Sequence, residues 1–268
     1  MPYDTIVLKK EGSIATVILN RPEVMNAISP QMFDELNDSL GDVAGDKDIR
    51  VVVLTGAGHA FSASVDIEAE SDGKDRFLPD LSPEAQRRFV QDVPQRVTKA
   101  IFNLEKPTIA MVNGPAVGDA FDWVLACDLR VASTNAKFMC GFIRMGLIPD
   151  TGATWFYPRL LGLTRALELL FTEDWLDADE AYRIGLLNRL VPPEELESAT
   201  MALAKKVAGQ APIAVKLAKM HVYRGLQMSL HESLDMAASD EVMALGTQDH
   251  KEALAAFRKR RRPVFKGK

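Results

Sequence analysis

The chain has 268 residues, 47% of them hydrophobic, which is enough to build one large domain or one domain with a small appendage. The formal net charge of -5 excludes the domain-wide basic field that a nucleic-acid-binding protein needs. The N-terminus shows no basic-then-apolar signal region, and no apolar run is long enough to span a bilayer. We therefore expect a protein of the cytoplasm, or of an organelle matrix, with no nucleic-acid or membrane partner.

The cysteines and histidines predict no metal or disulfide site. Cys127 and Cys140 lie in apolar or strand-like contexts, so we expect two reduced, buried thiols. The 4 histidines show no metal-ligand spacing. Gly118 belongs to no Gly-x-Gly-x-x-Gly run, so neither a nicotinamide nor a flavin site is indicated.

The first half of the chain alternates short strand-like runs with helical patterns. Residues 6–8 and 14–19 flank a Glu-Gly pair and predict an antiparallel hairpin. A helical pattern follows over 30–40. The runs 51–54 and 108–112 are continuously apolar, which is typical of strands covered on both faces.

The rest of the chain becomes progressively helical. Residues 67–83 are rich in Asp, Glu, Ser and Gly and predict a surface loop. A helix is expected over 87–104, and shorter strands over 128–132 and 187–191. After Pro193 the pattern is wholly helical. Two pairs have the spacing of a capping box, Asp177 with Glu180 and Ser229 with Glu232.

Two junctions between a buried strand and a helix pass through small residues, at 54–66 and 112–122. The first amides of a helix have no internal acceptor and point toward incoming negative charge. Two such amides that converge on one carbonyl oxygen would form an oxyanion hole. Either junction by itself is more typical of an ordinary turn.

Two aspartates are candidates for chemistry, and each also has a structural interpretation. Asp150 follows Pro149 and precedes a helical stretch through Leu161, so it has the position of a helix N-cap. Asp122 lies one turn into the helix after the second junction, where the helix dipole favours an acid.

Taken together, the motifs resemble the crotonase (enoyl-CoA hydratase/isomerase) superfamily. They occur in the family's order over essentially the whole chain. They are Leu19-Asn20-Arg21-Pro22-Glu23 with Asn26-Ala27, Leu54 to Asp66, Val112 to Gly118, Ala126 to Arg130, Gly146 to Asp150, Pro158 to Gly162, and Ala181 to Leu186.

The resemblance implies an α/β fold, a spiral of ββα repeats with a C-terminal helical trimerisation part. On this basis residues 1–195 would form an acyl-CoA-binding core and residues 196–268 the helical part. It implies an acyl-CoA substrate, no cofactor beyond the coenzyme A of that substrate, and a homotrimer or a dimer of trimers. A helical end with apolar residues on several faces agrees with assembly.

The resemblance also implies which backbone amides hold the thioester oxygen: those of Val65 and Asp119. The chain departs from the family at both places. Ser64 stands where glycine is usual, and Asp119-Ala120 replace a usual Gly-Gly pair. An inward carboxylate at Asp119 would repel an enolate, so we expect this side chain to point outward as a first-turn helix acid.

By the same resemblance, Asp122 and Phe142 occupy the places of the two glutamates of the family's hydratases, and Phe142 cannot transfer a proton. Asp150 matches an aspartate used by relatives that shift double bonds, within a shared run that continues to Trp155. One base suffices to remove a proton and return it elsewhere, whereas adding water normally needs water activated and a proton placed. We therefore predict Asp150 and Asp122 as catalytic residues and favour isomerisation over hydration.

Further positions are implied to contact the substrate. A terminal run from Phe257 to Phe265, which includes Lys259, resembles the family tail that approaches the coenzyme A phosphates. The predicted substrate-binding residues are Arg21, Ala63, Ser64, Asp66, Gly118, Phe142, Trp155 and Lys259.

Other activities on the same fold stay open. They are an enoyl-CoA hydratase, a hydrolase or C–C lyase acting on a thioester or β-dicarbonyl substrate, and a non-catalytic acyl-CoA binder. The residues carry no readable code for the acyl group.

Overall fold

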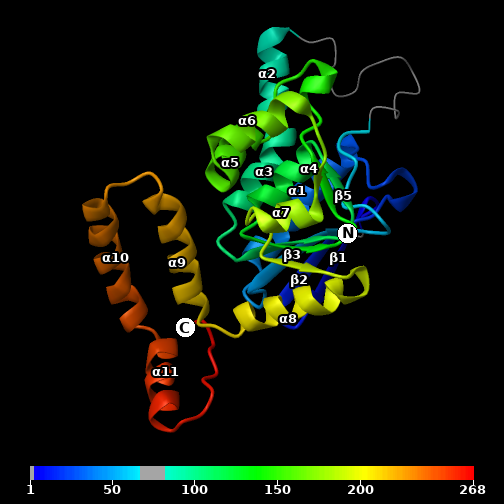
Figure 1. Cartoon of the computed structure of the whole chain (residues 1–268). Helices are drawn as coiled ribbons and strands as arrows, with labels where there is room; N and C mark the ends of the chain where they lie inside the picture. Colours follow the sequence, from blue (N-terminus) through cyan, green and yellow to red (C-terminus); the bar gives the residue numbers. More distant parts are fainter. Residues whose placement is uncertain (1–2, 67–81) are drawn as a thin grey trace.

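The computed structural model describes residues 3–66 and 82–268 of the chain (Figure 1). The segment predicted as a surface loop lies outside these residues except at its end. There Ser82 accepts a hydrogen bond from the amide of Ala85 and begins helix α2 (Pro83–Asp92). The described residues form a six-stranded sheet, a three-stranded sheet and the helices around them, so the predicted α/β class is confirmed.

The larger sheet has the strand order β1-β2-β3-β4-β6-β9. Its first two strands form the predicted antiparallel hairpin, and every other neighbouring pair is parallel. Parallel neighbours require crossover connections, which explains why helices alternate with strands along the chain. The strands are β1 (Ile6–Glu11), β2 (Ile14–Leu19), β3 (Val51–Gly56), β4 (Thr108–Val112), β6 (Leu129–Ser133) and β9 (Arg189–Val191).

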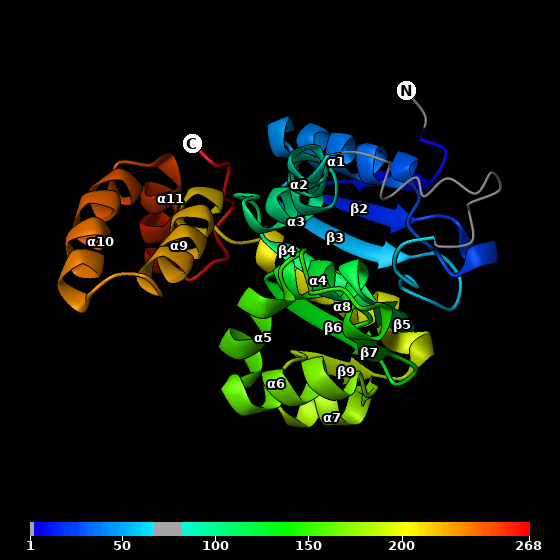
Figure 2. The same cartoon turned by 90° about the horizontal axis from the view of Figure 1, so that it is seen from above.

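Both faces of this sheet are buried, as the continuous apolar runs predict. In β3, Val52 and Leu54 pack into the larger core, and Val51 and Val53 pack into the smaller core on the other face. The larger core is closed by α1 (Pro30–Gly45), α3 (Pro94–Phe102) and α4 (Asp119–Ala126), and the smaller by α8 (Leu196–Ala208). Figure 1 shows α8 on one side of the sheet and α3 and α4 on the other, and Figure 2 looks onto the strands from above.

A second, smaller sheet lies beside the first and places the candidate site. It consists of β5, parallel to β7, with β8 antiparallel to β7. The chain thus repeats strand, strand and helix as it winds. The remaining elements of this part are β5 (Pro115–Val117), β7 (Lys137–Met139), β8 (Leu176–Asp177), α5 (Ala153–Leu161), α6 (Leu163–Thr172), α7 (Ala178–Arg183), and the short helices η1 (Pro22–Val24), η3 (Ile143–Met145) and η4 (Pro193–Glu195).

The single helix predicted over 87–104 is wrong, because the structure has two helices there, α2 and α3. The break lies at Val93, which has φ -113° and ψ -81°, and Pro94 follows it. Proline lacks the amide that would continue the hydrogen-bond ladder and disfavours helical geometry in the residue before it. After the break, α3 packs on the larger core, where Val97 and Ile101 are buried.

The last three helices, α9 (Pro212–Gly225), α10 (Leu230–Leu245) and α11 (Gln248–Arg258), stand apart from the sheets (Figures 1 and 2). The predicted capping box is present at the start of α10, where Ser229 and Glu232 bond each other's backbone amides. Asp177 likewise accepts from the amide of Glu180 at the start of α7.

Helix α9 is tied to the rest of the protein through Asp128. The Asp128 carboxylate lies 2.7 Å from Lys219 Nζ and accepts a hydrogen bond of 2.8 Å from the Tyr223 hydroxyl. It also accepts from the backbone amide of Thr108 at 2.7 Å, so one carboxylate joins α9 to the start of β4. The Tyr223 ring packs edge-on against Phe102, with centroids 4.8 Å apart.

Candidate active site

The two strand-to-helix junctions lie side by side. The amide of Ser62 donates to the carbonyl of Pro115 at 3.1 Å, and the amide of Val117 donates to the carbonyl of Ser62 at 3.1 Å. These bonds make a parallel bridge between Ser62 and Ala116. Segments far apart in sequence are therefore fixed against each other by backbone, independently of their side chains.

A second bridge sets the direction of the Val65 amide. The amide of Ile28 donates to the carbonyl of Ser64 at 2.8 Å, and the amide of Asp66 donates to the carbonyl of Ile28 at 3.0 Å. In such a bridge the N–H of Val65 points away from Ile28. Among the described residues, no acceptor takes a hydrogen bond from this amide.

The amide of Asp119 opens α4 and likewise has no acceptor among residues 3–66 and 82–268. The residue before it, Gly118, donates to the carbonyl of Met139 at 3.1 Å and has φ 55°. A Cβ added at Gly118 would lie 2.3 Å from Ser64 Oγ. Gly118 and Ser64 are therefore in contact, which brings the amides that follow them, those of Asp119 and Val65, into the same neighbourhood.

The side chain of Asp119 points inward, and the expectation that it faces outward is wrong. It is 3% exposed, and its Oδ1 lies 2.9 Å from the Thr151 hydroxyl. The sequence places Asp119 in the first turn of a helix but cannot show which side of that turn is covered. Here the loop carrying Thr151 covers it.

Asp122 is fully buried, with 0% of its surface exposed. Its Oδ2 accepts from the Thr151 hydroxyl at 2.7 Å and from the amide of Ala153 at 3.0 Å. Helix α5 begins after Gly152, which has no side chain to cap it, so Asp122 supplies the missing acceptor from α4. Its other oxygen, Oδ1, has no hydrogen-bond partner among the described residues.

The Thr151 hydroxyl stands between two carboxyls. A hydroxyl carries a single proton, so it donates to one carboxyl and accepts from the other, which must then be protonated. Burial raises the pKa of Asp119 to about 7; the charge of Asp150 adds to this effect and the Thr151 bond opposes it. Burial also raises the pKa of Asp122 well above its usual range.

Asp150 is the more accessible of the three carboxyls. It is not the N-cap of α5, since that position is held by Gly152. Its backbone carbonyl accepts a hydrogen bond of 2.9 Å from Gln95 Nε2, which ties the loop to α3. The side chain is half-buried, and burial raises the pKa of its carboxyl.

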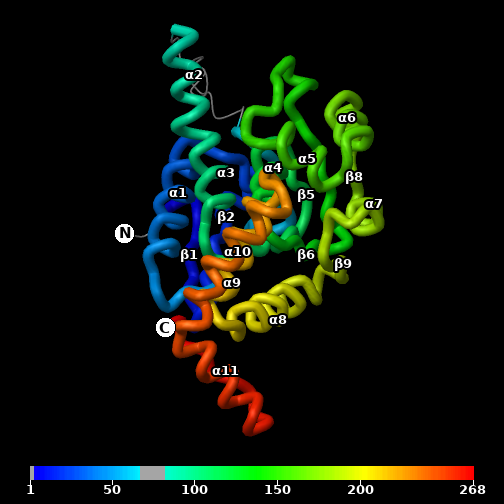
Figure 3. The backbone as a smooth tube through the Cα atoms, turned by 90° about the vertical axis from the view of Figure 1, so that its left-hand side faces the viewer, coloured from blue at the N-terminus to red at the C-terminus, as the bar shows by residue number. Residues whose placement is uncertain are grey.

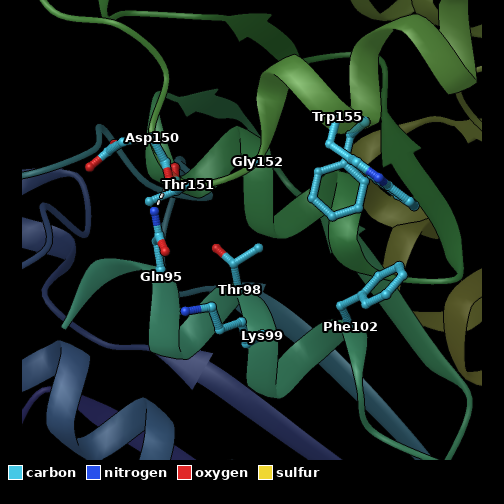
Figure 4. Close-up of a pocket in the computed structure, with 9 residues that line it drawn as sticks. Gln95, Thr98, Lys99, Phe102, Asp150, Thr151, Gly152 and Trp155 are labelled. Carbon is cyan, nitrogen blue, oxygen red and sulfur yellow. Dashed lines mark hydrogen bonds between the residues drawn. The ribbon is translucent and has the colours of Figure 1, made fainter. Parts of the chain in front are cut away.

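Asp150 lies at one end of a pocket between α3 and the start of α5 (Figure 4). The cavity has a volume of about 350 Å³. Its other end is aromatic. The Phe102 and Trp155 rings meet edge-on with their centroids 5.3 Å apart, and the centroids of the Trp155 and Phe156 rings are 5.1 Å apart. The lining residues are Gln95, Thr98, Lys99, Phe102, Asp150, Thr151, Gly152, Trp155 and Phe156.

Of the predicted substrate-binding residues, Trp155 lines this pocket, and Ala63, Ser64 and Gly118 lie at the paired junctions. Arg21 and Asp66 come together, with Nη1 and Oδ2 2.9 Å apart.

The remaining two predicted substrate-binding residues lie elsewhere in the protomer. Phe142 is buried in the larger core at the start of η3. Lys259 follows α11, which lies away from α3 and α5 in Figures 1 and 3.

Several residues of the site carry no signal in the sequence. Gln95, Thr98 and Lys99 line the pocket from α3.

Glu173, 4% exposed, is another residue of this kind. It accepts hydrogen bonds from the amides of Gly141 at 2.7 Å, Phe142 at 3.2 Å and Ile143 at 2.9 Å, and so fixes the loop that leads to Asp150. No local pattern marks a residue that acts over such a separation.

The cysteines behave as expected. Cys127 and Cys140 are buried and unpaired, and burial raises the pKa of each thiol to about 12. No cluster of metal-ligating side chains occurs in the part of the chain that the structure describes. Within that same part, none of the helices has the length and apolar character required to cross a bilayer.

Known proteins resemble this chain along nearly its whole length. A family model described as enoyl-CoA hydratase/isomerase matches residues 9–268. A crotonyl-CoA hydratase of Syntrophomonas wolfei is 35% identical over 266 residues, which cover 99% of each chain. A 1,2-epoxyphenylacetyl-CoA isomerase of Escherichia coli is 33% identical over 258 residues, which cover 96% of this chain and 97% of that one.

Solved structures agree with the fold. The structure of an enoyl-CoA hydratase from Bacillus anthracis matches with a TM-score of 0.91 and 32% identity, covering 99% of this chain and 100% of the other. One from Geobacillus kaustophilus matches with a TM-score of 0.89 and 34% identity, covering 100% of both. The expected spiral of ββα repeats with a helical C-terminal part is thereby confirmed.

Proposed function

Because the chain belongs to the enoyl-CoA hydratase/isomerase family, we propose that it moves the double bond of an enoyl-CoA thioester, with Asp150 as the base. The amides of Val65 and Asp119 hold the thioester oxygen. Preorganised donors of this kind stabilise the negative charge that develops when a proton leaves the neighbouring carbon.

The observation that carries the proposal is the place of Asp150. Asp150 is half-buried and lines one end of a pocket whose other end is aromatic, whereas Asp122 is sealed inside the protein. A raised pKa brings a carboxyl closer to the value that suits a proton shuttle near neutral pH. Asp122 assists from the interior by holding Thr151 and the amide of Ala153.

The reaction then has two proton transfers through one group. Asp150 removes a proton from the α-carbon of a 3-enoyl-CoA, and the electron pair passes into the thioester as a dienolate. The same carboxyl returns a proton to the γ-carbon, which leaves the double bond between the α- and β-carbons. The raised pKa of Asp119, about 7, favours its neutral form below that pH, and the neutral form keeps a second negative charge away from the enolate.

The residues that line the pocket favour an apolar acyl group on the substrate. Phe102, Trp155 and Phe156 form its far end, and apolar surface of this kind favours alkyl or aryl chains over charged ones. Its volume of about 350 Å³ suits a group of medium size.

The experiment is to incubate the purified protein with a 3-enoyl-CoA, and separately with a 2-enoyl-CoA, in deuterated water. Products are followed by chromatography and mass. Asp150→Asn is compared with Asp92→Asn, which alters an exposed aspartate in α2. We expect double-bond migration with deuterium uptake that is lost in Asp150→Asn and kept in Asp92→Asn.

Hydration is the second candidate, favoured by relatives that are named hydratases at 35% identity. It predicts a 3-hydroxyacyl-CoA from the 2-enoyl substrate. Hydration that persists in Asp150→Asn would contradict Asp150 as the base. Release of free coenzyme A would instead indicate thioester hydrolysis.

We also propose that the protein assembles as a homotrimer or a dimer of trimers through its C-terminal helices. Leu230 is 71% exposed, Val242 69% and Phe257 84%, and together they leave a large apolar surface on α10 and α11. Light scattering of the full chain tests this, and a monomer at micromolar concentration would contradict it.

A further inference from the structure

Ser64 adopts a backbone conformation that side chains rarely take. Its φ is 76°, in the left-handed region that favours glycine. The turn is fixed on both sides: the amide of Ser64 donates to Ser62 Oγ at 3.3 Å, and its carbonyl accepts from Ile28 at 2.8 Å. Glycine at this position would relieve the backbone strain, yet the chain has serine there. Strain of this kind is often kept where the side chain has a function.

The hydroxyl of Ser64 stands between the two amides of the proposed oxyanion hole. On one side, only its own Cβ, Cα and carbonyl carbon separate it from the nitrogen of Val65. On the other, it contacts Gly118, since a Cβ added there would lie 2.3 Å from Oγ. The Gly118 carbonyl carbon carries the nitrogen of Asp119.

The Ser64 hydroxyl is also free to donate a hydrogen bond to a ligand. No described residue forms a hydrogen bond with Ser64 Oγ, and the side chain is only partly buried. A serine hydroxyl rotates about its Cβ–Oγ bond and donates one proton. It therefore differs from the two backbone amides, whose directions are set by the bridges around them.

We propose that the Ser64 hydroxyl is a third hydrogen-bond donor to the thioester oxygen, beside the amides of Val65 and Asp119. The inference rests on the proposed acyl-CoA function and deepens it. The donor strengthens as the carbonyl oxygen gains charge, so it acts more on the enolate than on the bound substrate. Gly118 is required for this arrangement, because any side chain there would occupy the position of Ser64 Oγ.

The test uses two variants that both remove the hydroxyl but affect the backbone in opposite ways. Ser64→Gly relieves the left-handed conformation, and Ser64→Ala keeps its strain. Binding is measured by calorimetry for butyryl-CoA and for S-butyl-CoA, a thioether in which a methylene replaces the carbonyl. Exchange of the α-protons of butyryl-CoA for deuterium reports enolate formation without depending on any later step.

We expect both variants to bind butyryl-CoA about fivefold more weakly and S-butyl-CoA unchanged, as for loss of one hydrogen bond. Exchange should slow by roughly 100- to 1,000-fold, the loss that is typical when one oxyanion-hole donor is removed.

Three outcomes would overturn the proposal. Equal or tighter butyryl-CoA binding by Ser64→Gly would mean that the hydroxyl obstructs the oxygen. A loss in only one variant would trace the effect to the backbone. Equal loss for the thioether would indicate a general disturbance of the pocket. Because the thioester and thioether are compared in binding, the result stands even if the wild-type protein neither isomerises nor hydrates enoyl-CoA.

Discussion

Asp122 caps a helix to which it does not belong: its Oδ2 accepts the first amide of α5, that of Ala153, at 3.0 Å. Thr151, which donates to the same Asp122 oxygen, and Gly152 lie between Asp150 and Ala153 in the sequence. The Asp122 carboxyl of α4 therefore positions the loop that carries the proposed base.

The first prediction distinguishes a structural role of Asp122, as a hydrogen-bond acceptor for the start of α5, from a role in proton transfer. In Asp122→Asn the amide oxygen still accepts from Ala153, so we expect stability within about 1 kcal/mol of wild type and turnover within tenfold. Asp122→Ala removes the oxygen that accepts both hydrogen bonds and should cost roughly 2–4 kcal/mol by urea denaturation. A loss of activity above about 100-fold in a stable Asp122→Asn would instead show that Asp122 transfers a proton.

A second prediction concerns the hydroxyl that joins Asp119 and Asp122. Thr151→Val keeps the shape but leaves two buried carboxyls without their shared partner, at a cost of roughly 1–3 kcal/mol. Thr151→Ser retains the hydroxyl and should lose less than about 1 kcal/mol. Equal destabilisation of the two variants in urea would indicate that methyl packing, and not the hydrogen bonds, is responsible.

The third prediction is a pH dependence of stability. Asp119 has a pKa of about 7 in the folded protein and an ordinary value of 3.8. Between these values the folded state binds more protons than the unfolded state, so the free energy of unfolding falls as pH rises through this window. The contribution is at most about 4 kcal/mol, since one pKa unit corresponds to about 1.36 kcal/mol. It is fully present below pH 3.8 and exhausted above about pH 7.

Asp119→Asn removes this titration, so its stability should fall less than that of wild type between pH 5 and pH 8. Urea denaturation at unit steps of pH measures the difference. Asp122 and Asp150, whose pKa values are also raised, leave part of the slope in place. Parallel curves for the two proteins would contradict a protonated Asp119.

The fourth prediction concerns the attachment of α9. Lys219 and Asp128 form an ion pair with side chains only 10% and 16% exposed. Lys219→Met leaves Asp128 without its cation and should cost roughly 2–3 kcal/mol. Arg88→Met breaks a pair with Glu84 whose side chains are 71% and 75% exposed, and should cost less than about 1 kcal/mol. Similar losses in the two variants would show that burial does not distinguish these pairs.

The sequence was informative where a pattern is local. The hairpin at 6–19 and the strand at 51–56 were predictable from the apolar pattern. A strand buried on one face alternates apolar and polar residues, and a strand buried on both faces is continuously apolar. The break at Val93 was not predicted, although Pro94 is itself a local signal against a continuous helix.

The site was less predictable because its decisive contacts link distant segments. Asp119 and Thr151 are 32 residues apart, and Glu173 caps amides about 30 residues before it. Helix position alone could not give the direction of the Asp119 side chain. The catalytic and oxyanion assignments stay predictions until the variants above are measured.

The bridge between Ser62 and Ala116 has a consequence for how such a protein can change. The spacing of the two junctions is maintained by main-chain atoms, which every amino acid possesses. Replacements at positions 64 and 119 therefore leave the positions of the two junctions unchanged while altering the side chains around the proposed oxyanion hole. One relative is named a hydratase and another an isomerase, at 35% and 33% identity to this chain. Such a pair is expected when the backbone arrangement is kept and the side chains around it vary.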